Sequence, residues 1–219
     1  MNRAIICIFF SICILACAAP QKKEKAEEIS PPVEKKEVKH TEQETKSLEV
    51  FSEILELIES SENRESVLPQ VEQLYGKIIK EYPEAPLAQE SYWKLITLYV
   101  EDYTPPAYEK AESLYHEFTG RYPNSFVEGF IEDTLAHSYY RHADWDKLVK
   151  LCTPAYKEYI DRGIKPRASL IFMYSEANYN LGNYTEAEKG YEATVELFPK
   201  SNEGLRSKAM LQKMNKSGN

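Results

Sequence analysis

The feature that most constrains the fold of this chain is an aromatic-proline pair that recurs at the ends of apolar stretches. The three pairs are Tyr82-Pro83, Tyr122-Pro123 and Phe198-Pro199. A proline ring cannot continue the hydrogen-bond ladder of a helix, so each pair predicts a helix end. The first two prolines are 40 residues apart and the last two are 76 apart, or two units of 38. A further helix end is therefore expected near residue 160, where Gly163 can supply a left-handed C-cap.

Helical periodicity accounts for nearly all of the chain from Ser47 onward. Apolar residues recur at the three- and four-residue spacing of a helix that buries one face. The first such stripe comprises Leu48, Phe51, Ile54, Leu55 and Ile58. No stretch alternates apolar and polar residues for long enough to predict a β-strand. We therefore expect one all-α domain over residues 47–219.

The last unit matches a known repeat in detail. Its motif runs through a helix end, a turn and a second helix: Ala177-Asn178-Tyr179-Asn180-Leu181-Gly182-Asn183-Tyr184-Thr185-Glu186-Ala187, then Tyr191 and Pro199. This pattern resembles the tetratricopeptide repeat, in which paired helices touch at small residues such as Ala187. Asn183 is expected to cap the second helix together with Glu186, which has the spacing of a capping box.

The resemblance extends over roughly Ala85 to Pro199, and Ser47 to Pro83 forms a degenerate first unit. The chain departs from the family in its longer period, in an inserted loop around residues 103–106, and in Leu148 at a normally small position. The resemblance implies a tetratricopeptide-like superhelical solenoid of about four helix pairs. A solenoid must cover the apolar face of its last repeat. One more stripe predicts such a C-terminal capping helix: Leu205, Ala209, Met210 and Met214.

The N-terminus has the composition of an export signal. Arg3 precedes an apolar run from Ala4 to Leu15, which is shorter than the roughly 20 apolar residues that span a bilayer. Residues 14–17 resemble the lipobox of bacterial lipoproteins. That resemblance implies a signal peptide over residues 1–16, cleavage before Cys17 and acylation of Cys17. The alternatives are an ordinary secretory signal cut near residues 18–20 and an uncleaved anchor.

The next segment, residues 17–46, begins with Cys17, whose lipidation the lipobox resemblance implies. From Gln21 to about Lys46 the chain is rich in Lys and Glu and poor in apolar residues, which predicts a disordered tether. Lipobox, tether and Tyr-Pro helix ends together resemble envelope lipoproteins of the kind found in outer-membrane β-barrel assembly. The implied location is the cell envelope, as an outer-membrane lipoprotein that faces the periplasm. The chain has a net charge of −8, which argues against nucleic acid as a partner.

The sequence offers little to support catalysis. It contains no Gly-rich phosphate loop, no Cys pair beyond the signal and no nucleophile in a recognised context. Asp133 and His137 lie one helical turn apart, but a third metal ligand is not evident. Cys152, next to apolar residues, is interpreted as a buried packing residue. We therefore expect no enzyme activity, no metal site and no cofactor.

Binding has a better physical basis. In the family that the chain resembles, the first helices of successive repeats line a concave groove. The corresponding positions combine aromatic and charged side chains: Trp93, Glu101, Phe130, Asp133, His137, Tyr140, Arg141, Phe172, Glu176 and Tyr179. Such residues anchor protein interfaces disproportionately. The expected function is an envelope scaffold or assembly factor that binds other envelope proteins in this groove. The alternative is recognition of a cell-wall or small-molecule ligand, with or without hydrolysis.

Overall fold

A computed structural model describes residues 41–217 of the chain, and the expected signal peptide 1–16, Cys17 and the tether up to residue 40 lie outside these residues. In chain order the helices are α1 (Glu42–Ser60), α2 (Arg64–Glu81), α3 (Pro86–Thr97), the π-helical turn η1 (Leu98–Asp102), α4 (Tyr108–Arg121), α5 (Val127–Arg141), α6 (Trp145–Arg162), α7 (Ala168–Asn180), α8 (Tyr184–Leu197) and α9 (Asn202–Ser217). The first helix begins five residues before the expected domain start at 47, because Thr41 and Glu44 form a capping box.

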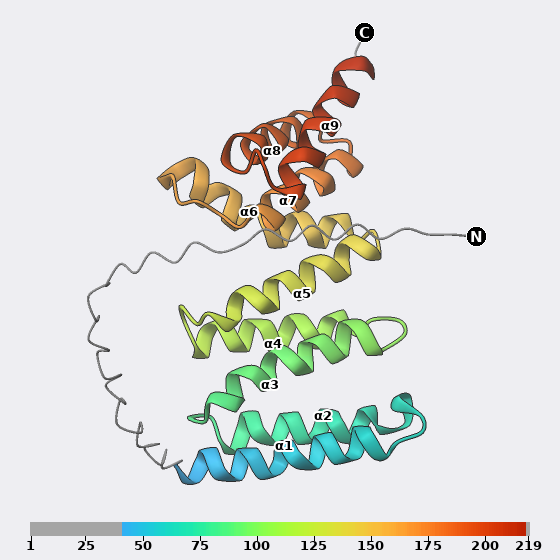
Figure 1. Cartoon of the computed structure of the whole chain (residues 1–219), viewed down its shortest axis with the longest axis vertical. Helices are drawn as coiled ribbons and strands as arrows, with labels where there is room; N and C mark the ends of the chain where they lie inside the picture. Colours follow the sequence, from blue (N-terminus) through green and yellow to red (C-terminus); the bar gives the residue numbers. More distant parts are fainter. Residues whose placement is uncertain (1–40, 218–219) are drawn as a thin grey trace, which may run out of the picture. The chain divides into compact units, whose positions relative to one another are not determined.

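The helices of residues 41–217 form four pairs and a final single helix (Figure 1). Neighbours along the chain pack together, and the first helices of successive pairs also pack, as α1 on α3, α3 on α5, and α5 on α7. Helix α9 packs on both α7 and α8, in the place where the next pair would begin. The chain is therefore an all-α, tetratricopeptide-like solenoid, and the predicted fold class is confirmed. Within these residues, no helix has the length and apolar character needed to span a bilayer.

The predicted helix ends are confirmed. Helices α2, α4 and α8 end immediately before Tyr82, Tyr122 and Phe198, and each of these residues donates its backbone N–H to the carbonyl four residues back. At the fourth end, Gly163 closes α6 in the left-handed region, at φ 67°. A side chain there would be strained, so glycine takes the role that the Tyr-Pro pair has elsewhere.

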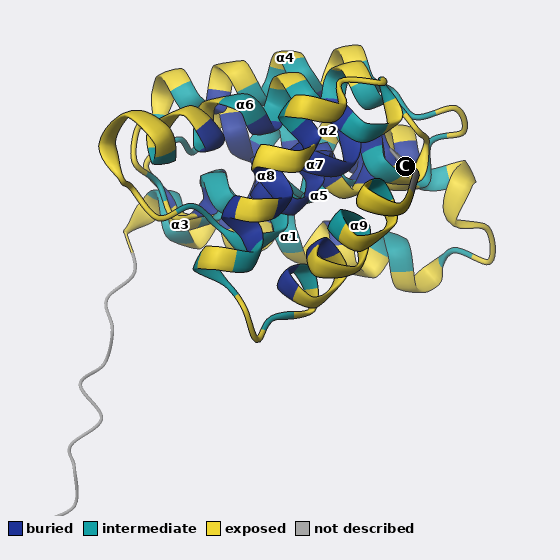
Figure 2. Cartoon of the chain, turned by 90° about the horizontal axis from the view of Figure 1, so that it is seen from above, coloured by how far each residue is buried: buried dark blue, intermediate teal, exposed yellow. Residues whose placement is uncertain are grey.

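Helix α7 lies at the centre of the last two pairs. Nine consecutive residues, Leu170 to Asn178, are buried, so its whole circumference is covered (Figure 2). A helix that is buried all round needs neighbours on every side, here α5, α6, α8 and α9. Cys152 is also fully buried, as predicted, and burial raises the pKa of its thiol.

Three local predictions are wrong. Leu48 and Leu55 are 43% and 45% exposed, whereas Ile54 of the same predicted stripe is buried and Val50, outside the stripe, is buried beside it. Leu205 on α9 is 58% exposed, and α9 packs through Met210 and Met214 on a slightly rotated face. Asn183 makes no side-chain cap to α8, since its amide donates to the Asn178 side chain at 3.2 Å. In each case tertiary packing overrode a preference that a local pattern suggested.

Candidate partner-binding groove

Six of the predicted groove residues line one open hollow between α3 and α5. Its cavity volume is about 420 Å³, and the six are Trp93, Glu101, Phe130, Asp133, His137 and Arg141. The 3.6-residue period explains the grouping, because these positions fall on one side of each helix. Thr97 and Thr134 complete the lining and were not predicted, since a threonine within a helix carries no sequence signal of its own.

Trp93 is fixed in the middle of this groove. Its indole N–H donates to Thr134 Oγ1 at 2.9 Å, and its ring stacks on Phe130 with centroids 5.2 Å apart. Lys94 Nζ lies 4.5 Å from the Trp93 ring centroid. The indole nitrogen is thus satisfied within the protein, which leaves the aromatic surface of Trp93 and Phe130 for contact with a partner.

The groove continues past Trp93 into a second, apolar hollow of about 390 Å³. Trp93 and Phe130 line both hollows, so the two are continuous. The other lining residues are Pro86, Leu87, Gln89, Glu90, Phe126 and Val127. Phe126 is 81% exposed, which is unusual for so large an apolar side chain. Phe126 was not among the predicted residues, although a phenylalanine directly after the Pro-Asn-Ser turn is a sequence signal for an exposed aromatic side chain.

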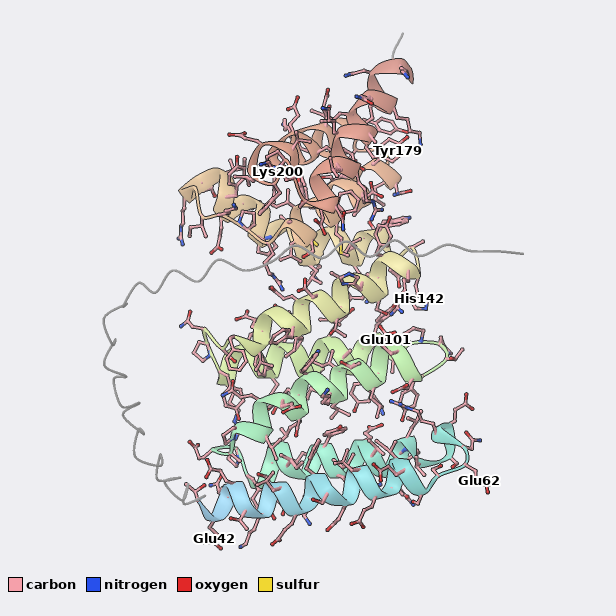
Figure 3. The ribbon with its side chains drawn as sticks, in the orientation of Figure 1. Glu42, Glu62, Glu101, His142, Tyr179 and Lys200 are labelled. Atoms are coloured by element: carbon pink, nitrogen blue, oxygen red, sulfur yellow. The ribbon has the colours of Figure 1, made fainter. Side chains whose placement is uncertain are left out.

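The opposite end of the groove is polar. Glu101, in the turn η1 that follows α3, forms an ion pair with Arg141 at the end of α5. This hydrogen-bonded pair raises the pKa of Arg141. In Figure 3, Glu101 lies close to His142, and the same residues line a neighbouring recess. π-helical turns often occur at functional sites, and this one aims Glu101 at the first helix of the next pair.

Asp133 and His137 do not form a metal site. His137 Nδ1 donates to the main-chain carbonyl of Asp133 at 2.7 Å. The Asp133 carboxylate instead pairs with Arg167 at 2.7 Å and accepts from Ser169 at 3.1 Å. Among residues 41–217, no group of three or more His, Cys, Asp or Glu could hold a metal ion. Asp133 therefore orients α5 against the start of α7.

Two predicted groove residues of the fourth pair are buried, which corrects their assignment, and the third, Tyr179, is half-buried. Phe172 and Glu176 are 3% and 9% exposed. Arg206 of α9 lies over the Phe172 ring at 4.4 Å, and Lys213 lies over the Tyr179 ring at 5.4 Å. Helix α9 thus covers this face, so the open groove is confined to α3 and α5.

Tyr140 belongs to this covered part of the molecule as well. Its hydroxyl donates to Glu176 at 3.0 Å and lies 3.3 Å from a guanidinium nitrogen of Arg206. Its ring meets Trp145 edge to face, with centroids 5.6 Å apart. Tyr140 therefore joins α5, α7 and α9, and it is a packing residue that does not line either hollow.

This arrangement of paired helices and stacked first helices is the geometry of a tetratricopeptide solenoid. Residues 169–201 match the family model of the tetratricopeptide repeat. The match covers α7, α8 and the Phe198-Pro199 helix end, which is the unit whose sequence motif was most complete. Tetratricopeptide repeats generally mediate protein–protein interactions. No curated protein matches the chain.

Proposed function

We propose that this protein is a lipid-anchored interaction scaffold of a bacterial cell envelope that holds a partner polypeptide between α3 and α5. The observation that supports it most strongly is the continuous groove around Trp93 and Phe130. Two hollows of about 390 and 420 Å³ meet at these rings. Exposed aromatic surface flanked by charged groups is the composition of interface hot spots.

The two ends of the groove favour different parts of a partner. The Phe126 end offers apolar surface for an aliphatic or aromatic side chain. The Glu101–Arg141 end offers an ion pair whose outer atoms face solvent, since these side chains are 31% and 53% exposed. A partner segment with an apolar anchor at one end and polar groups at the other matches this polarity.

Truncation of the groove aromatics tests this proposal. We expect Trp93→Ala to weaken partner binding at least about tenfold, since truncating a central aromatic anchor removes a hot spot. A photo-cross-linking residue at position 130 should attach to a partner polypeptide in the native envelope. The same residue at Ile160, which is 59% exposed on α6 away from the groove, is the control and should not. Equal cross-linking from both positions, unchanged by Trp93→Ala, would show that the groove is not the interface.

The anchor is a separate prediction. Replacing Cys17 with alanine removes the thiol that a diacylglycerol group would occupy, so the chain should leave the membrane fraction and lose radiolabelled fatty acid. Several acyl chains on one residue exceed the one-chain threshold for lasting attachment, so the expected change is nearly complete. Cys152→Ala is the matched control, because its buried thiol is not accessible to acylation. Undiminished labelling of Cys17→Ala would exclude lipidation at this residue.

A further inference from the structure

A third hollow, outside the groove, lies between α4, α5 and α6. Its cavity volume is about 350 Å³, within the range of small-molecule sites. The lining residues are Glu112, Tyr115, His116, Glu128, Glu132, Leu135, Tyr139, Lys147, Lys150, Leu151 and Pro154. Successive helical residues are about 100° apart, so Glu132 and Leu135 lie on the side of α5 opposite Phe130 and His137. The hollow and the groove therefore use different faces of one helix.

A repeated cluster of contacts shows which residues of successive pairs are equivalent. A glutamate on one second helix meets a tyrosine and a lysine of the next pair in two places: Glu72 with Tyr99 and Lys110, and Glu112 with Tyr139 and Lys147. The tyrosine hydroxyls donate to the carboxylates at 2.9 and 2.8 Å. The lysines pair with them at 2.8 and 2.5 Å. Between the second and third pairs, the first helices therefore correspond at a spacing of 40 residues, from Tyr99 to Tyr139, and the second helices at 37, from Lys110 to Lys147.

This correspondence explains why the hollow exists. In the earlier pair, Tyr92 and Phe118 fill the interior, fully buried, with ring centroids 5.4 Å apart. The equivalent residues of the next pair are Glu132 and Ala155. A carboxylate and a methyl group occupy far less volume than two aromatic rings, so the same packing cannot form. A position that holds a buried aromatic residue in the earlier pair here holds an ionisable residue that lines the hollow. Such a departure from a repeat's own pattern is typical of functional sites.

Most charges around the hollow are already paired. Glu132 accepts from Tyr115 at 3.1 Å and forms an ion pair with Arg167. Burial raises the pKa of Glu132, and the Arg167 charge opposes that shift. Among the carboxylate and ammonium groups of the lining, two remain, Glu128 on α5 and Lys150 on α6. Within residues 41–217, neither side chain makes a hydrogen bond or an ion pair. One acid and one base without a hydrogen-bonded partner thus line a shared hollow from different helices. The Lys150 charge also acts on the Glu112 carboxylate of the same lining.

We propose that this hollow binds a small zwitterion with an apolar side chain, either a free amino acid or a short peptide. The ammonium group pairs with Glu128 and the carboxylate pairs with Lys150, as charge-assisted hydrogen bonds. The apolar side chain rests on the Leu151 and Pro154 surface. This ligand site goes beyond the proposed scaffold function and does not depend on it.

Calorimetric titration of the full chain tests the proposal. The probes are L-leucine and the dipeptide leucyl-leucine. The probe with the lower dissociation constant shows whether the ligand is a free amino acid or a short peptide. L-leucinamide lacks the carboxylate and 4-methylpentanoate lacks the amine, so each is expected to bind at least about tenfold more weakly. Glu128→Gln and Lys150→Met should each weaken the binding of L-leucine to a similar extent. Neither residue is buried, so both changes leave the interior packing in place.

Two further variants separate this site from the groove and from a folding defect. Glu132→Tyr installs the residue of the earlier pair, fills the hollow and should abolish binding. Trp93→Ala should leave leucine binding unchanged while it weakens partner cross-linking. Absence of saturable binding by both zwitterions would overturn the proposal. It would also be overturned if both Glu128→Gln and Lys150→Met bound as wild type, or if L-leucinamide bound as well as L-leucine.

Discussion

Replacing Glu176 with alanine is expected to lower the free energy of unfolding by about 2–4 kcal/mol, since each buried hydroxyl left without an acceptor costs about 1–3 kcal/mol. Its carboxyl accepts from Tyr191 at 2.5 Å and from Tyr140 at 3.0 Å. Tyr191 is completely buried, so no water can replace the lost acceptor. Burial first, and then the bond to Glu176, raise the pKa of Tyr191.

Urea unfolding followed by circular dichroism measures this effect. Glu176→Gln keeps one carbonyl acceptor, so it should lower the free energy of unfolding less than Glu176→Ala does. Glu188→Ala, at an exposed glutamate of α8, is the surface control and should change stability by no more than about 0.5 kcal/mol. If Glu176→Ala matched Glu188→Ala, the two tyrosine hydrogen bonds would contribute nothing net to the stability of the last two pairs.

The solenoid was predictable because its signals are local. The Tyr-Pro ends at 82–83 and 122–123 and the left-handed Gly163 are determined by backbone sterics within a few residues. Helical periodicity then sets which residues can be buried, and the motif of the last unit identifies the pairing. None of these inferences required knowledge of which helices meet in space.

The groove was predictable only where no other element covers it. Trp93, Phe130 and Arg141 share one hollow because helix periodicity alone places them on one side of α3 and α5. Phe172 and Glu176 follow the same spacing, yet α9 lies over them. The apolar stripe of α9 predicted a capping helix, but it could not show which side chains of α7 that helix covers.

The third hollow could not be predicted from spacing at all. Glu132 looks like an ordinary polar residue of α5 until its equivalence to Tyr92 is known. That equivalence depends on contacts of Glu112 with Tyr139 and Lys147, which are distant in sequence. Side-chain volume missing from a repeat is visible only when the repeats are superposed through such contacts.

Replacing Gly190 with alanine is expected to lower the free energy of unfolding by about 1–3 kcal/mol, the usual cost of overpacking a filled interior. Gly190 lies on α8 against Tyr174 and Ser175 of α7. An added Cβ would collide with Ser175 Oγ and would lie 3.1 Å from Cδ1 of Tyr174. Ser175 cannot turn away freely, because it is fully buried and its hydroxyl donates to Ile171 at 2.8 Å.

Two variants make the Gly190 test specific. Gly76→Ala has nothing within 4 Å of the new Cβ, so α2 should gain about 0.5–1 kcal/mol from its higher helix propensity. Ser175→Ala removes the colliding oxygen, so the double variant should be more stable than the sum of the two single losses predicts. If the losses in the free energy of unfolding were additive, the Ser175 hydroxyl would not be the group that requires a glycine at position 190. The added Cβ would then be accommodated by a shift of α8 away from α7.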